Sequence, residues 1–118
     1  MNETRAAGPV VSALTRDGFR VDENVYRALL LTPSRAAEWS PPPLEALTEA
    51  ALAGVLDPLP EFVLLGTGAA MRRPPVALVR ALDARGVGVE AMDSRAAARA
   101  WGVLRAEGRV IAGAFYPF

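Results

Sequence analysis

The sequence predicts a single α+β domain built on a mixed β-sheet, and three observations support this prediction. The chain has 118 residues, which is within the usual size of one domain. Its apolar content of 52% is enough for one packed core. Short strand-like segments fill its first third, whereas strands and helices alternate in its last half. We expect the folded core to span residues 8–118 and residues 1–7 to be flexible.

The first third of the chain has the short apolar segments and turn residues typical of β-structure. Strands are expected over residues 10–15, 19–21 and 25–32. Gly18 and Asn24 belong to the turns between them. A helix over residues 28–31 is the alternative for the third segment. The strand is preferred because Asn24 and Pro33 bracket a segment of strand length.

The middle of the chain is expected to be irregular and then helical. The run of prolines at 41–43 has no N–H donors for a helix or a central strand, so residues 34–43 should form a loop. Thr48 is a candidate N-cap for a short helix with one apolar face, formed by Leu52, Val55 and Leu56. Residues 57–60 end this helix.

The last half alternates between apolar runs and segments of helical periodicity. Strands are expected over residues 62–65, 87–92 and 109–115. A helix should follow Pro74-Pro75 and end at Gly86. A second helix, with Ser94 as N-cap, should run to about Glu107. This β-α-β-α-β order predicts that part of the sheet is parallel.

The residue types that the chain lacks exclude several kinds of chemistry. The sequence has no Cys, His or Lys, because all 13 basic residues are Arg. A thiolate nucleophile, a histidine base or metal ligand, and a Schiff-base lysine are therefore excluded. We predict no enzymatic activity, no cofactor and no metal.

The charge and hydropathy patterns bear on partners and location. The 13 acidic residues balance the arginines, so nothing in the net charge favours nucleic acid. No apolar run has a membrane-spanning length, and no signal or transit peptide is recognised. We expect a cytoplasmic protein without direct membrane insertion, whose oligomeric state the sequence leaves open.

The segment Gly66-Thr67-Gly68 is the first candidate binding site. Two glycines between a strand and a helix allow a phosphate to approach the backbone, and Glu90 lies where a ribose-binding acid would sit. The dinucleotide-binding pattern is incomplete, however, because Met71 occupies the position of its third glycine. A tight strand exit is the preferred interpretation.

Nearby arginines could complete an anion site with this loop. Arg72 and Arg73 follow the glycines, and Arg99 shares one face of the last helix with Arg95. Ordinary solvated arginines, balanced by neighbouring acids, are the alternative and the preferred interpretation.

Two further features have competing interpretations. Ser94 next to Asp93 could suggest a catalytic pair, but without a suitable base Ser94 is better explained as a helix cap. The C-terminal aromatic residues Phe115, Tyr116 and Phe118 could form a partner surface or fold back on the sheet.

Several sequence blocks together resemble a known family. These blocks are residues 62–68, Pro74-Pro75, residues 86–94 with Ala97, and residues 104–110. They are similar to the family that contains mitochondrial complex I assembly factor 3 and many small bacterial and archaeal proteins of unknown function. The resemblance implies a mixed sheet with a β-hammerhead-like N-terminal part, and action through protein–protein contact.

The chain departs from the family pattern in the last helix. Where the family has Arg-Thr-Tyr-Asn, this sequence has Arg99-Ala100-Trp101-Gly102, so a hydroxyl and an amide are lost. A glycine inside a helix also costs about 1 kcal/mol relative to alanine, which suggests a local packing reason.

Two functional hypotheses follow. The first is a non-catalytic protein-interaction module with a protein partner, assisting the assembly of a respiratory or other membrane complex. The second is a small-molecule or anion binder that uses the 66–68 loop with Arg72, Arg73 and Arg99.

Overall fold

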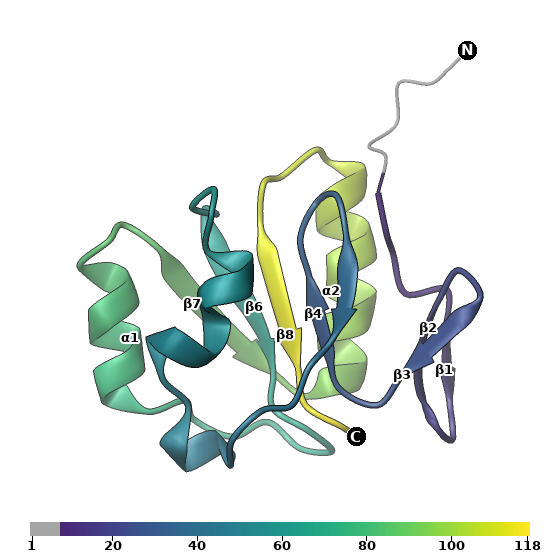
Figure 1. Cartoon of the computed structure of the whole chain (residues 1–118), viewed down its shortest axis with the longest axis horizontal. Helices are drawn as coiled ribbons and strands as arrows, with labels where there is room; N and C mark the ends of the chain where they lie inside the picture. The colour runs from purple at the N-terminus through teal and green to yellow at the C-terminus, as the bar shows by residue number, and fades with distance from the viewer. Residues whose placement is uncertain (1–7) are drawn as a thin grey trace.

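The N-terminal part of the chain forms a small antiparallel sheet in the computed structural model, which describes residues 8–118. Its strands are β1 (Ala13–Thr15), β2 (Gly18–Val21) and β3 (Asn24–Tyr26), in the order β1-β2-β3. Figure 1 shows this sheet at one end of the molecule, beside the main sheet. The predicted N-terminal hairpin is thus present, whereas the expectation for residues 1–7 lies outside the described residues.

The main sheet is mixed, as predicted. Its strands are β4 (Leu29–Leu31), β5 (Ala36–Glu38), β6 (Phe62–Gly66), β7 (Gly88–Met92) and β8 (Ala112–Phe115). Their order is β5-β4-β8-β6-β7, with β8, β6 and β7 mutually parallel and β4 antiparallel to both of its neighbours. The α+β class inferred from the sequence is confirmed.

Two expectations for residues 25–43 are wrong. The single strand over residues 25–32 is divided between the two sheets, because Ala28 is buried between β3 and β4 and its carbonyl accepts a hydrogen bond from the Trp39 N–H (3.1 Å). The loop expected over residues 34–43 contains β5, which pairs with β4 at Leu30↔Ala37. Neither contact could be read from local sequence, since both join segments that are several residues apart.

The helices occupy the predicted regions but differ in detail. They are the 3₁₀ helices η1 (Leu44–Ala46) and η2 (Glu49–Val55), and the α-helices α1 (Val76–Asp83) and α2 (Ser94–Ala106). The helix after Thr48 is therefore not an α-helix, and the Thr48 side chain makes no capping hydrogen bond. The N-cap of α2 is Asp93 rather than Ser94, because the Asp93 carboxylate accepts the Ala96 N–H (2.9 Å).

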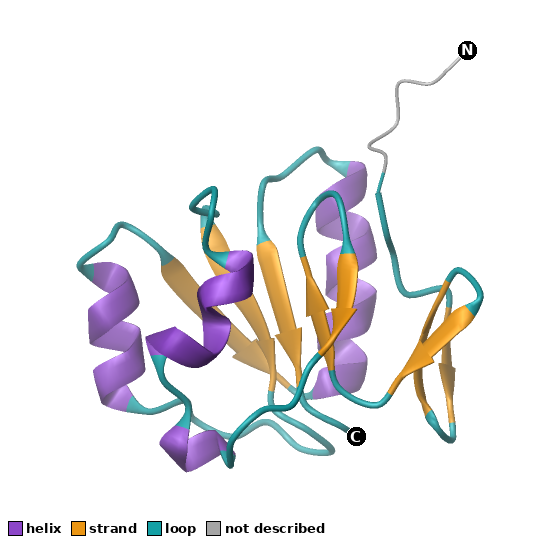
Figure 2. Ribbon diagram, viewed as in Figure 1, coloured by secondary structure: helices purple, strands orange, loops and turns teal. Residues whose placement is uncertain are grey.

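The helices cover both faces of the main sheet (Figures 1 and 2). One core layer joins η1, η2 and α1 to the sheet, and the other joins α2 and β2 to its opposite face. The central strand β8 carries small residues, so that both layers come close to it. A Cβ at Gly113 would lie 3.2 Å from the Trp101 ring and 3.3 Å from Leu31, so a side chain here would have to displace its neighbours by a few tenths of an ångström.

Candidate functional site

The C-terminal ends of the three parallel strands meet at one edge of the main sheet. From there the chain passes to α1 after β6 and to α2 after β7, and these two helices pack in opposite layers. In open α/β sheets such a switch point is where ligands bind. The segment Gly66-Thr67-Gly68 lies at this point, so the structure places the first candidate site where the fold would favour one.

The Ser94 hydroxyl joins the segments that meet at this switch point. Ser94 is fully buried, and its Oγ accepts the Gly68 N–H (2.8 Å) and donates to the Tyr116 carbonyl (2.6 Å). The Tyr116 N–H donates to the Gly66 carbonyl (2.8 Å), which fixes the C-terminal segment across the strand ends. A Cβ at Gly66 would lie 2.8 Å from this Oγ. Gly66 therefore allows the close approach of Ser94.

Thr67 closes the loop with its own side chain. Its hydroxyl lies 2.7 Å from the Ala70 carbonyl and 3.2 Å from that of Met92, and it accepts the Arg72 N–H at 3.0 Å. Its backbone N–H donates to the Met92 carbonyl (2.9 Å). The N–H groups of Thr67, Gly68 and Arg72 are thus engaged within the protein, and a phosphate at the loop would have to compete with these bonds.

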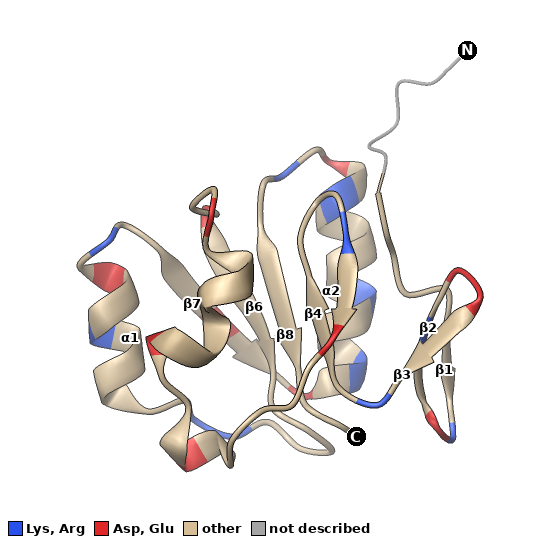
Figure 3. Cartoon of the chain, in the orientation of Figure 1, with Lys and Arg blue, Asp and Glu red and all other residues tan. Residues whose placement is uncertain are grey.

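The candidate arginines lie in different places, and Figure 3 shows the basic residues spread over the chain. Arg72 forms an exposed ion pair with Glu45 of η1 (Nη2–Oε1, 3.4 Å), and no ion pair within residues 8–118 involves the exposed Arg73. Arg99 lies on α2 beside β1, at a shallow pocket of about 140 Å³. Arg72 and Arg99 therefore belong to opposite layers, and no contact brings them together.

Phe115 and Phe118 turn toward the interior. Phe115 has no exposed surface, and its ring centroid is 5.5 Å from that of Phe19. Phe118 meets Phe19 edge-on at 5.0 Å, while the Arg95 guanidinium lies 4.5 Å from the centre of the Phe118 ring. Phe115 thus presents nothing to a partner, and Phe118 is half-buried.

Tyr116 is held on the other face of the sheet. Its hydroxyl donates to the Pro42 carbonyl (2.8 Å), and its ring meets Trp39 edge-on at 5.0 Å. Burial, with a smaller contribution from the Glu45 carboxylate, raises the pKa of Tyr116 to about 12. This geometry matches the alternative in which the aromatic tail folds back on the sheet.

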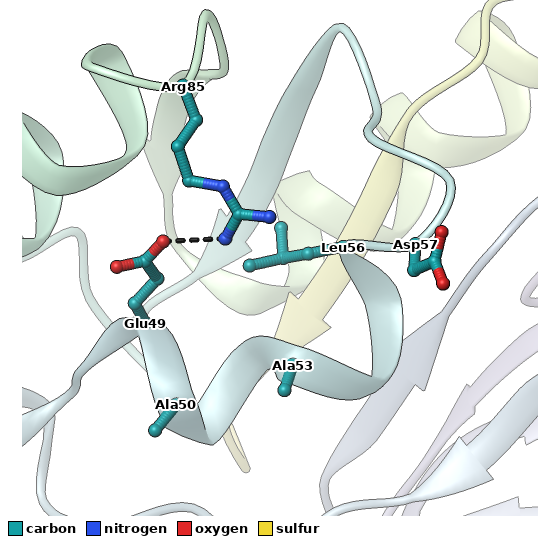
Figure 4. Close-up of a pocket in the computed structure, with 6 residues that line it drawn as sticks. All are labelled: Glu49, Ala50, Ala53, Leu56, Asp57 and Arg85. Atoms are coloured by element: carbon teal, nitrogen blue, oxygen red, sulfur yellow. Dashed lines mark hydrogen bonds and ion pairs between the residues drawn. The ribbon is translucent and has the colours of Figure 1, made fainter.

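An open groove between η2 and α1 was not predicted from the sequence. One pocket of about 330 Å³ is lined by Glu49, Ala50, Ala53, Leu56, Asp57 and Arg85 (Figure 4). A second, of about 230 Å³, is lined by Leu47, Thr48, Glu49, Ala50, Ala77, Leu78 and Ala81. The pockets share Glu49 and Ala50 and therefore adjoin; we refer to them together as the η2–α1 groove.

Small side chains on both helices create this groove. Ala50 on η2 lines one pocket together with Ala77 and Ala81 on α1, and Ala53 lines the other pocket. An ion pair from Arg85 Nη1 to Glu49 Oε2 (2.6 Å) joins η2 to the segment that follows α1. The spacing of the alanines could have been noticed in the sequence. That η2 lies beside α1 could not, because the contact depends on the tertiary arrangement.

The described residues contain neither a metal cluster nor a membrane helix. Within residues 8–118, no three carboxylate side chains gather where a metal ion could be held. No helix in this range has the length and apolarity needed to cross a bilayer.

Comparison with known proteins gives consistent matches. A family model described as "Protein of unknown function (DUF498/DUF598)" matches residues 11–116. NADH dehydrogenase [ubiquinone] 1 alpha subcomplex assembly factor 3 of Bos taurus is 31% identical over 110 residues, which are 91% of this chain and 60% of the bovine protein. The chain thus spans less than two thirds of that relative's length.

Solved structures agree with the fold. A crystal structure of a Bordetella parapertussis protein has a TM-score of 0.85 and 34% identity, covering 95% of this chain and 98% of the other. A Bordetella pertussis protein described as a Mth938-like domain has a TM-score of 0.80 and 28% identity, covering 99% and 92%. These matches confirm the resemblance inferred from the sequence blocks.

Proposed function

Because this chain belongs to the DUF498/DUF598 family, and because its relatives include a complex I assembly factor, we propose that it is a non-catalytic protein-interaction module. In this role it assists the assembly of a respiratory or other membrane complex. The observation that carries the proposal is the similarity to assembly factor 3 over 91% of the chain.

The η2–α1 groove supports this proposal as one contact surface. It is open, lined mainly by alanine and leucine, and shallow enough to receive side chains of another protein. On α1, Val76 is 65% exposed and Val79 is 36% exposed. Exposed apolar side chains that gather on one surface mark many protein-interaction sites.

The proposal is tested in the native host. We expect crosslinking of the tagged protein to recover subunits of one membrane complex, and a strain without the gene to contain less of that assembled complex. The variant Ala50→Arg places a charge where the two pockets adjoin and should abolish the crosslinks. Ala84→Arg adds the same charge at an exposed position outside the groove and is the matched control. Normal levels of all membrane complexes in the deletion strain, with no specific crosslink, would contradict the proposal.

We propose anion binding at the 66–68 loop as a second function, favoured by Arg73, which is exposed and forms no ion pair with the residues that the structure describes. It requires a thermal shift of the protein with nucleotides or organic anions. Saturation at 100 times the Kd would stabilise the fold by about 2.7 kcal/mol. An Arg72→Ala, Arg73→Ala double variant that keeps the full shift would exclude these arginines.

A further inference from the structure

Among the described residues, no strand pairs with the outer edge of the main sheet at β7. In the order β5-β4-β8-β6-β7, β7 has a neighbour on one side only. Its five residues pair with β6 in an unbroken parallel register from Phe62↔Gly88 to Gly66↔Met92. The opposite edge, β5, is a strand of three residues. β7 is therefore the longer and more regular of the two edges.

The hydrogen-bonding pattern shows which backbone groups are available. The Gly88 N–H donates to the Glu61 carbonyl, and the Met92 carbonyl accepts the Thr67 N–H. Along a parallel strand, the backbone N–H and C=O groups of successive residues point alternately to one side and the other. Gly88, Glu90 and Met92 therefore bond to β6. The N–H and C=O groups of Val89 and Ala91 point away from the sheet. No hydrogen bond within residues 8–118 engages them.

Most devices that protect sheet edges are missing from β7. Such edges usually carry proline, a bulge or an inward-facing charge, or are covered by a loop or helix. β7 has no proline and no bulge, and its one charged residue is the exposed Glu90 at its centre. Glu90 takes part in no ion pair among the described residues.

We propose that β7 accepts an extended segment of a partner protein as an added antiparallel strand, with an arginine or lysine opposite Glu90. This inference rests on the proposed function, since it describes how the interaction module would hold its partner. Val89 and Ala91 would each exchange two backbone hydrogen bonds with the incoming strand. Glu90 lies between these two residues and would form a pair without backbone hydrogen bonds with the basic residue of the added strand. The two Cα atoms of such a pair are about 4.5 Å apart.

The same geometry disfavours a second copy of this chain. When β7 pairs antiparallel with β7 of a second copy, one register alone uses all free N–H and C=O groups of Val89 and Ala91. In that register Glu90 lies opposite Glu90 of the copy. Like charges directly opposite one another destabilise a sheet. Shifting the register by two residues separates the charges but gives up half of these hydrogen bonds. The Glu90 carboxylate therefore favours a partner strand with a basic residue and disfavours self-association through β7.

Peptide titration followed by NMR tests the proposal. The probes are the heptapeptide Thr-Val-Thr-Arg-Thr-Val-Thr and its twin with Glu in place of Arg, added to the isotope-labelled protein. We expect the Arg peptide to shift the Val89 and Ala91 amides and to bind about 2- to 30-fold more tightly than the Glu peptide. Glu90→Arg should invert this preference. Glu38→Arg, the same charge change on the opposite edge strand, should leave it unchanged.

Several results would overturn the inference. These are no shift at Val89 and Ala91 with either peptide, equal binding of the two peptides, or an unchanged preference in Glu90→Arg. A stable dimer of the wild-type chain that Ala91→Pro dissociates would assign the edge to self-pairing instead. Crosslinking in the native host separates this inference from the proposed function. If Ala91→Pro captures the same membrane-complex subunits as wild type, the edge inference fails while the proposed function stands.

Discussion

Replacing Ser94 with alanine tests whether its hydroxyl holds the C-terminal segment across the ends of the strands. The substitution removes one hydroxyl that bonds to the Gly68 N–H at 2.8 Å and to the Tyr116 carbonyl at 2.6 Å. A typical hydrogen bond contributes about 1 kcal/mol, and a buried group left without a partner costs about 1–3 kcal/mol. Because Ser94 and Gly68 are both buried, we expect a loss of about 2–4 kcal/mol in the free energy of unfolding.

Urea unfolding followed by tryptophan fluorescence measures this loss. At about 4 °C per kcal/mol for a domain of this size, the Tm should fall by about 8–16 °C. Ser12→Ala is the matched control, because the Ser12 hydroxyl makes an exposed bond of 3.3 Å to the Arg20 carbonyl, and its loss should cost less than about 0.5 kcal/mol. If the two variants differ by less than about 0.5 kcal/mol, the hydrogen bonds of the Ser94 hydroxyl do not hold the C-terminal segment in place.

Three further predictions use the same unfolding measurements or a pH titration. Gly102→Ala should stabilise the protein by about 1 kcal/mol, since nothing lies within 4 Å of a Cβ built there; a destabilised variant would reveal a packing role. Asp93→Ala should cost about 1 kcal/mol through loss of the α2 cap, whereas Asp93→Asn should retain most of the stability; equal losses would exclude capping. The pKa of Tyr116 rises from 10.0 to about 12 in the folded state. The stability that comes from this pKa difference is therefore fully present below about pH 10 and is lost as the pH rises through 12. An absorbance titration of the tyrosines measures the pKa, and Tyr116→Phe should abolish both the titration step near pH 12 and this loss of stability.

The segments with strong local patterns could be predicted from the sequence. The strands β6 and β7 and the helices α1 and α2 were predicted nearly at their observed positions, because each has an apolar periodicity bounded by proline or glycine. The divided segment around Ala28 and the strand β5 were missed. Both exist because β4 pairs with β8, some 80 residues later in the chain, and no local pattern encodes that pairing.

The candidate site illustrates the same limit. The glycines at 66 and 68 were recognised, but the role of Ser94 was not, because its hydroxyl was assigned to a helix cap. Gly66 leaves room for this hydroxyl, and Gly68, at a φ of 111°, donates its N–H to it. That cap is made by Asp93, so Ser94 is free to join Gly68 to Tyr116. The expected packing reason for Gly102 is also absent among the described residues. For Ser94 the deciding contacts join segments that are more than 20 residues apart in the chain, so no local pattern could predict them.

The position of β8 has a consequence for how the chain is made. β8 lies between β4 and β6, and within residues 8–118 no other strand joins the β5-β4 pair to the β6-β7 pair. The five-stranded sheet can therefore be completed only after residues 112–115 have left the ribosome. The same arrangement makes the protein a candidate for a split reporter, in which a peptide carrying the last strand restores the sheet when it binds the remainder of the chain.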